Sequence, residues 1–334
     1  ITFFQENFIF KLRYKILKDV INEFIVCESI YDHRGRKKKL NFDKKLIKKK
    51  KIRYLIYKKK FPFRNSPWQN QALQREFILK NIDHINDEDY IFFSDPDEIP
   101  DPKKLRSIVL KHKYGIFLQK NFNYKFNLFN EYESPWEGTR VSKKKNLKSI
   151  DDLRQKILIK NLRYPFWRID KEKSIQIIND GGWHFNNILS PKEISLKLKS
   201  FAHTEFSHDK FSNSEVIKYK IKKKSDLFER GHTYKKIKLK AFPRILLKEI
   251  SSMSMLFQSH LYITINHFFF LKLNYYNEEM YLFYHLYHIY LYLLHNKLLQ
   301  RYQLLLQFHQ DLKHLGKKHY LVDLQIYKKF LCFY

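Results

Sequence analysis

The sequence contains little cysteine, and a strongly apolar stretch near its end is too short for a typical membrane span. The two cysteines, Cys27 and Cys332, stand far apart among 334 residues and cannot form a disulfide framework. We therefore expect a reducing compartment, with Cys27 packed as a small hydrophobic side chain inside the apolar run 24–27. The apolar stretch 281–294 falls short of the roughly 20 residues that a membrane-spanning helix needs.

Acidic residues are also few beside the basic ones. The chain has 34 Asp and Glu against 65 Lys and Arg, so its formal net charge is +31. Lysine-rich runs occur at 36–39, 48–51, 58–60, 143–145 and 222–224. One interpretation is a surface for an anionic partner, such as a membrane, a nucleic acid or a phosphorylated glycan. The scattering of these runs and the scarcity of glycine favour the other interpretation, a compositional bias.

The chain begins at Ile1 rather than at methionine, and we expect its start to be truncated. A targeting segment ahead of this residue would not be visible. We expect a protein of the cytoplasm or of the periphery of a membrane, with an anionic membrane surface as a possible partner and no specific nucleic acid.

One short segment concentrates the acidic residues. The apolar run 90–93 is typical of a buried strand, and it leads directly into Asp95, Asp97 and Glu98. Pro96 and Pro100 argue against a central strand there, so we expect the three acids on a turn at the carboxyl end of the strand. Ligands of open α/β sheets bind at that end.

Three carboxylates so close together repel one another unless a cation or solvent compensates. Oxygen ligands suit Mg²⁺ or Mn²⁺, which usually share their coordination shell with substrate phosphates. This segment, called the acidic turn (95–98) below, therefore predicts a site for a metal ion and a diphosphate. A solvated acidic turn is the simpler alternative.

Strand-like and helix-like segments alternate through about residue 185, which predicts an α/β protein with a mixed, mainly parallel sheet flanked by helices. The predicted strands are 23–28, 52–57, 90–93, 114–118, 121–129 and 174–178, after a first strand that ends near residue 4. The predicted helices are 7–18, 68–83, 102–112 and one that begins near residue 190. We expect a break at 130–136, a loop at 143–150 and a tight glycine turn within 179–185.

Residues 251–334 differ in composition from the rest. They contain eight of the fifteen histidines and only four acidic residues. We therefore divide the chain into a domain of residues 1–250 and an aromatic, histidine-rich helical extension of residues 251–334, whose role the sequence does not indicate. His285 and His288 do not make a clean metal-ligand spacing.

Several segments together resemble glycosyltransferase family 17, which includes the β-1,4-mannosyl-glycoprotein 4-β-N-acetylglucosaminyltransferase that adds the bisecting GlcNAc to N-glycans. The matching residues are Phe3-Phe4, 24–28 with His33-Arg34-Gly35, Trp68 with Gln74-Arg75, Ser94 to Pro100, Gly182 to His184 and Lys199 to Glu205. The resemblance covers about residues 1–245 and stops before the extension.

The resemblance implies a GT-A-like fold, a UDP-sugar donor and a divalent cation, Mn²⁺ or Mg²⁺. Asp97 is then the first candidate for the metal ligand. Asp95 would hold the ribose or the metal, and Glu98 would orient the turn or bind the metal through water. Enzymes of this fold often add a third ligand, for which His184 and His203 are the candidates; each is equally a candidate for a structural, hydrogen-bonded histidine.

Further candidates surround the acidic turn. An inverting transfer needs a general base, for which Glu205 and Glu137 are suitable types. Arg75 and Arg168 are candidates for binding the diphosphate, or for ion pairs with the turn. There are two more candidates. Glu28, at a strand end, would contact the nucleoside, and Trp183 would stack on a sugar or pack in the core.

We therefore expect a metal-dependent inverting glycosyltransferase that transfers GlcNAc from UDP-GlcNAc to a glycan or glycolipid acceptor. The alternative is a non-catalytic basic protein that binds polyanions or a membrane surface. A family member that folds without activity is a third possibility.

Overall fold

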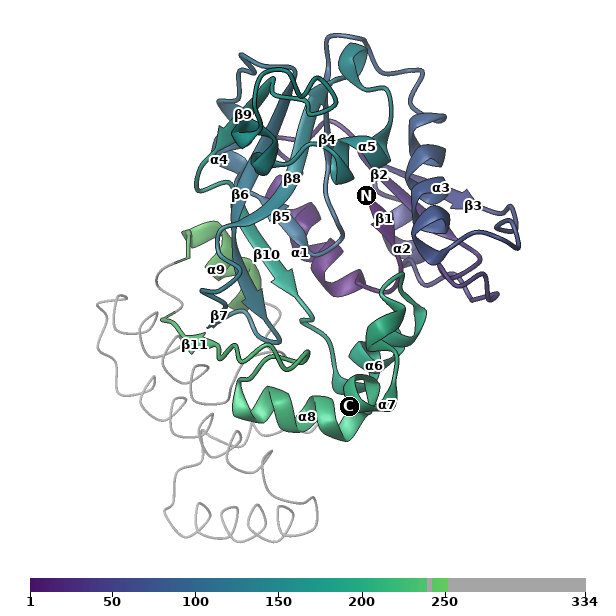
Figure 1. The fold of residues 1–334 in the computed structure, drawn as a ribbon, viewed down its shortest axis with the longest axis vertical. Helices are drawn as coiled ribbons and strands as arrows, with labels where there is room; N and C mark the ends of the chain where they lie inside the picture. The colour runs from purple at the N-terminus through teal and green to yellow at the C-terminus, as the bar shows by residue number, and fades with distance from the viewer. Residues whose placement is uncertain (239–241, 252–334) are drawn as a thin grey trace, which may run out of the picture. The chain divides into compact units, whose positions relative to one another are not determined.

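The computed structural model describes residues 1–238 and 242–251, all of which lie in one compact unit. This part confirms the predicted mixed α/β class (Figure 1). The strands are β1 (Thr2–Phe3), β2 (Phe24–Ser29), β3 (Ile52–Tyr57), β4 (Tyr90–Phe93), β5 (Glu98–Pro100), β6 (Tyr114–Asn123), β7 (Leu128–Phe129), β8 (Trp136–Lys143), β9 (Ile175–Ile178), β10 (Gly182–Asn186) and β11 (Lys235–Lys236). The extension predicted for 251–334 lies, apart from its first residue, outside the described residues.

The helices cover the sheets and connect their strands. They are α1 (Asn7–Leu17), α2 (Lys44–Ile47), α3 (Pro67–Leu79), α4 (Pro102–Arg106), α5 (Ile150–Gln155), α6 (Pro191–Ser200), α7 (Asp209–Ser212), α8 (Ser214–Lys223) and α9 (Arg244–Ser251), with 3-10 turns η1 (Lys144–Asn146), η2 (Ile159–Arg163) and η3 (Thr204–Phe206). In the described ranges, none of these helices is long and apolar enough to cross a membrane.

The smaller sheet contains β1, β2 and β3 in that order, with both pairs parallel. Helix α1 connects β1 to β2, as parallel neighbours require a crossover. The carboxyl end of β2 leads into the loop 30–38, which contains His33, Arg34 and Gly35.

The larger sheet is mostly antiparallel, so the parallel pairing that we expected to predominate is confined to part of the fold. Within it, β6 pairs antiparallel with β7 and β8, and parallel with β9 and β10. No helix interrupts residues 114–143, and strands joined by short connections run antiparallel.

Two local predictions in this sheet are wrong. Strand β8 occupies residues 136–143, whereas we expected a break at 130–136 and a loop at 143–150 and predicted no strand between them. Gly138 and the buried Arg140 make its sequence less apolar than that of a typical strand. Glu98 begins strand β5 instead of remaining in the turn. Pro100 is tolerated because β5 pairs only with β10 and lies at the sheet edge.

Side chains alternate between two cores, one on each face of the sheets. Val26 and Phe117 belong to the core that α1 and α9 cover, whereas their neighbours Cys27 and Ile116 belong to the core that α3 and α5 cover. This alternation follows from the two-residue period of a strand. Figure 1 shows α1 beside the sheets near their centre and α3 next to β2 and β3.

The helices that flank the acidic turn begin at strong sequence signals. Ser66 and Gln69 form a capping box at the start of α3, and Ser190 and Glu193 form another at the start of α6. Each helix also has proline at its first position. These caps fix the helix starts, and α3 and α6 carry Arg75 and Lys197, which contact the carboxylates of Asp95 and Asp97.

Candidate functional site

The acidic turn joins β4 to β5, and basic side chains hold it on several sides. Asp95 Oδ2 accepts a hydrogen bond from Arg154 Nη2 at 2.7 Å, and Asp95 Oδ1 lies 3.5 Å from Arg75 Nη2. Burial alone would raise the pKa of Asp95, but the charges of Arg154 and Arg75 outweigh it and lower that pKa. The Asp95 carboxylate is therefore ionised. Its side chain is 26% exposed, so a ligand can reach it.

Glu98 is fully buried, and both of its carboxylate oxygens are occupied. Oε1 accepts hydrogen bonds from Trp136 Nε1 at 2.9 Å and from Arg154 Nη2 at 2.8 Å, and Oε2 accepts one from the backbone N–H of Asp95 at 3.1 Å. The Glu98 carboxylate therefore holds the turn in place through both of its oxygens.

Asp97 lies between a lysine and a histidine. Its Oδ2 accepts a hydrogen bond from Lys197 Nζ at 3.1 Å, and its Oδ1 lies 3.4 Å from His184 Nε2. Burial would raise the pKa of Asp97, but the charges and hydrogen bonds of Lys197 and His184 reverse this and hold the pKa well below its usual range. Asp97 is thus an anion at neutral pH.

Lys197 links this carboxylate to the first residues of the chain. Its Nζ lies 3.8 Å from Glu6 Oε1, which is buried without a hydrogen-bond partner in the described part of the chain. Although burial would lower it, the pKa of Lys197 is raised by the charges of Asp97 and Glu6. Lys197 is therefore a buried ammonium group beside two carboxylates.

Arg13, on α1, holds the backbone of the turn. Its Nη1 donates to the carbonyl oxygen of Glu98 at 2.6 Å and to that of Asp95 at 3.2 Å. Burial lowers the pKa of Arg13 to about 10, which leaves the guanidinium charged at neutral pH. The turn is thus fixed through its main chain as well as through its side chains.

The ligand types at this turn fit a divalent cation that a diphosphate helps to hold. No group of three or more His, Cys, Asp or Glu side chains within the described ranges is placed to hold a metal ion. Asp97 and His184, however, bring an oxygen and a nitrogen to 3.4 Å, close to the ~3 Å that separates adjacent ligands at Mg²⁺ distances. Such ions often take only one or two protein ligands and complete their shell with water and substrate phosphate.

His184 is oriented by its strand and by a ring contact. In β10 it pairs with Glu98 of β5, and its ring stacks on Trp136 with centroids 4.7 Å apart. Its Nδ1 is buried and has no hydrogen-bond partner among the residues described. The neighbouring Trp183 points to the opposite face and packs in the apolar core, which matches the alternative role considered for it.

The second histidine candidate lies with one of the two candidate bases. His203 Nδ1 is 2.7 Å from Glu205 Oε1, and both side chains are more than half exposed. The His203 ring meets the exposed Trp68 ring edge-on at 4.6 Å. The hydrogen bond from His203 lowers the pKa of Glu205, so this carboxylate is ionised at neutral pH.

The other candidate base, Glu137, is more constrained. Its Oε2 accepts hydrogen bonds from Arg140 Nη2 and from the backbone N–H of Ile159, both at 3.2 Å. Its carbonyl oxygen accepts a hydrogen bond from Arg154, which also binds Asp95. Glu137 therefore adjoins the acidic turn through Arg154, with its carboxylate partly engaged.

Three other candidates make specific contacts. Arg75 contacts Asp95 and donates to Asp151 Oδ1 at 2.8 Å, which is the ion-pair alternative considered for it. Glu28 is fully buried and accepts hydrogen bonds from Lys38, Tyr54 and two backbone N–H groups. Arg168 is exposed and bonds to Asp170 through two nitrogens, and the structure does not bring it to the acidic turn.

Sequence reasoning missed the buried cations of the site. Arg13 and Lys197 are on the buried faces of α1 and α6, three or four residues from Ile9 and Ile194. A charged residue at a core position of an amphipathic helix was the available signal, since such a charge needs a buried partner. Arg154 lies four residues after the buried Ile150 on the short helix α5, which we did not predict.

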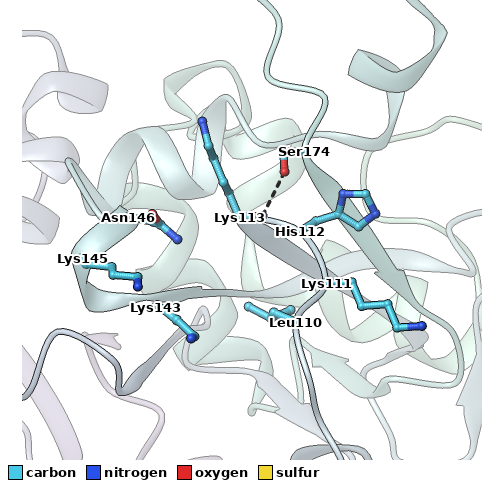
Figure 2. A pocket seen from close by; sticks show the side chains of 8 residues that line it. All are labelled: Leu110, Lys111, His112, Lys113, Lys143, Lys145, Asn146 and Ser174. Carbon is cyan, nitrogen blue, oxygen red and sulfur yellow. Dashed lines mark hydrogen bonds between the residues drawn. The ribbon is translucent and has the colours of Figure 1, made fainter.

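A separate cavity of about 280 Å³ lies at the opposite end of β4. It is lined by Leu110, Lys111, His112, Lys113, Lys143, Lys145, Asn146 and Ser174, as Figure 2 shows. Lys143 pairs with Tyr90, the first residue of β4, whereas the acidic turn follows its last residue. Glu88 forms ion pairs with Lys143 and Lys145, so part of the positive charge of the cavity is neutralised.

The fold brings ionised carboxylates, a histidine and buried cations together at one strand end. Many α/β enzymes bind their ligands at this position. Comparison with known families gives the particular group. The sequence matches the model of Glycosyltransferase family 17 over residues 1–271, and the chain belongs to that family. The protein is therefore a glycosyltransferase, and the match extends past residue 245, where we expected it to stop. No curated protein and no solved structure matches the sequence.

Proposed function

We propose that the protein is a metal-dependent inverting glycosyltransferase that transfers GlcNAc from UDP-GlcNAc to a glycan or glycolipid. Membership of family 17 implies a nucleotide-sugar donor and a glycan acceptor. The observation that carries the site assignment is the pair of Asp97 Oδ1 and His184 Nε2, 3.4 Å apart at the carboxyl end of β4. A Mn²⁺ or Mg²⁺ ion on this pair would supply positive charge to the departing UDP.

The residues of the chain take the remaining tasks. Arg13 and Glu98 keep the turn in one conformation, so Asp97 needs no rearrangement to face the donor. Such preorganisation is a large part of how enzymes stabilise developing charge. Asp95, the most exposed of the three carboxylates, faces the ribose or shares the ion.

The transfer itself exchanges one bond for another at the anomeric carbon. The acceptor oxygen forms its bond on the side opposite UDP, the bond from the anomeric carbon to the phosphate oxygen breaks, and a carboxylate takes the acceptor proton. We assign this role of base to Glu205, whose exposed and ionised carboxylate bonds to His203, and the His203 ring in turn contacts the Trp68 ring. Glu137 is the second candidate, and its contacts with Arg140 make it the less available base.

A panel of UDP-sugars with Mn²⁺ or Mg²⁺, scored by UDP release, tests both the activity and the site. We expect release with UDP-GlcNAc, and a drop of about 100-fold in Asp97→Asn, since removing one preorganised charge commonly costs that much. Asp180→Asn is the matched control, because its carboxylate is 77% exposed.

Full activity in Asp97→Asn would overturn the site assignment while leaving the enzyme class intact. Absence of UDP release with every sugar and both metal ions would overturn the proposed donor chemistry.

A further inference from the structure

Most basic side chains around the acidic turn already have acceptors. Four of them donate to carboxylates or carbonyl oxygens of the turn, and these are Arg13, Arg75, Arg154 and Lys197. Their hydrogen-bonding capacity serves to hold the turn. An incoming diphosphate therefore needs a further cation whose donors are still unused.

Arg34 differs from these four side chains. Its Nε and Nη2 atoms are buried, and they have no hydrogen-bond partner in the part of the chain that the structure describes. A buried charged donor that has lost water without gaining an acceptor is costly, and each such group in a native protein calls for an explanation. We propose that Arg34 binds a phosphate of the nucleoside-diphosphate donor, an inference that rests on the function proposed above.

The loop that carries Arg34 is rigidly built. Asp32 Oδ1 accepts hydrogen bonds from the backbone N–H groups of Arg34 at 3.0 Å and Arg36 at 2.9 Å. Gly35 has φ +80°, a conformation that other residues rarely adopt, and its N–H donates to the Asp32 carbonyl oxygen. The backbone on both sides of Arg34 is thus fixed before any ligand arrives.

Contacts with Phe201 connect this loop to the surroundings of Asp97. His33 bonds to Gln74 Oε1 at 3.0 Å, and its ring stacks on Phe201 at 5.9 Å. Lys197, the partner of Asp97, places its Nζ 5.3 Å from the centroid of the same Phe201 ring. One aromatic ring therefore contacts both the neighbour of Arg34 and the lysine that bonds to Asp97.

The unused atoms match the geometry of a phosphate. Nε and Nη2 form one edge of the guanidinium plane, and such an edge donates two parallel hydrogen bonds to two oxygens of one phosphate. A lysine ammonium offers a point charge without this paired geometry. The same edge also fits an anionic group on the acceptor or free phosphate, and these sources are separated by the choice of ligands.

The test uses the full-length chain. Calorimetry measures its affinity for UDP and for pyrophosphate, and ligand-observed NMR measures its affinity for uridine. We expect Arg34→Met to weaken UDP and pyrophosphate at least tenfold and to leave uridine unchanged, because only the phosphates contact Arg34. Arg34→Lys should recover part of the loss. Lys37→Met is the matched control, since it removes one exposed charge from the same loop.

Thermal unfolding of the ligand-free variants separates binding from a structural role. We expect Arg34→Met to unfold at the same temperature as the wild type or higher, because it removes a buried charge that lacks a partner. A marked fall in that temperature would make Arg34 structural and overturn the inference.

The binding outcomes are equally decisive. If Arg34→Met binds UDP with wild-type affinity, the inference is overturned. It is also overturned if the variant loses affinity for pyrophosphate alone, because Arg34 would then bind an anion other than the donor. If the wild type neither binds UDP nor releases it from any UDP-sugar, the proposed function itself fails.

Discussion

At the scale of single residues, the three carboxylates of the acidic turn have different tasks. Glu98 is fully buried and bonds to Arg154, Trp136 and a backbone N–H. Glu98→Ala leaves the Trp136 indole and the Asp95 backbone N–H without this acceptor and removes one of the two carboxylates that Arg154 binds. Breaking a buried charge pair commonly costs about 3–5 kcal/mol. We expect a loss of that size in the free energy of unfolding, measured by urea denaturation.

Asp95→Asn is the comparison for that variant. The Asp95 side chain is 26% exposed, so solvent replaces part of what the substitution removes, and we expect a loss of about 1 kcal/mol. Equal stability losses in Glu98→Ala and Asp95→Asn would contradict this division between a structural and a ligand-facing carboxylate.

The sequence located these carboxylates because strand, proline and acid signals are all local. It did not locate Arg154 or the pairing of Asp97 with Lys197, because residues 100 positions apart meet only through the packing of α6 against the turn. His184 was found through its glycine-rich segment, but its position beside Asp97 depends on the register of β10 with β5. Contacts between residues on different elements can be identified only once the fold is known.

At the scale of elements, strong local signals predicted the exact bounds of β3 and β4, and the bounds of α1 to within one residue. Strand β8 was not predicted because its stability comes from pairing with β4 and β6 instead of from apolar residues of its own. Helix α4 ends at Arg106, earlier than the predicted end at residue 112. Such boundaries depend on tertiary contacts that propensity does not contain.

The close pairing of β10 with β5 leads to a prediction at Gly182. This residue has φ +125°, and a Cβ there would lie 2.2 Å from the Ile99 carbonyl oxygen. Gly182→Ala should therefore cost roughly 3 kcal/mol or more in unfolding free energy, from strain and a backbone clash together. The shift of β10 should also displace His184 and reduce UDP release.

Gly35→Ala provides the control for that substitution. Gly35 has φ +80°, but a Cβ there meets no atom within 4 Å, so only the backbone strain of about 1–2 kcal/mol remains. Urea denaturation of both variants checks the difference. Similar losses at the two glycines would show that the β10–β5 contact is looser than the structure indicates.

At the scale of the whole molecule, the buried ionisable groups set how stability depends on pH. Burial lowers the pKa of His33 to about 4; the hydrogen bond to Gln74 raises that pKa, and the charge of Arg75 lowers it further. In the unfolded chain the imidazole pKa is about 6.5. Between these values the unfolded chain binds a proton that the folded protein does not, so folding stability falls as the pH falls through this window.

The expected slope from His33 is at most about 1.4 kcal/mol per pH unit between roughly pH 6.5 and 4, and it vanishes above that window. His33→Gln removes the titrating group and should flatten this part of the curve of unfolding free energy against pH. The loss below about pH 4 should persist, because the lowered pKa values of Asp95 and Asp97 add stability that disappears only as these carboxylates become protonated. Urea denaturation at half-unit steps from pH 3 to pH 8 separates the two windows, and an unchanged slope between pH 6.5 and 4 in His33→Gln would assign that loss to another group.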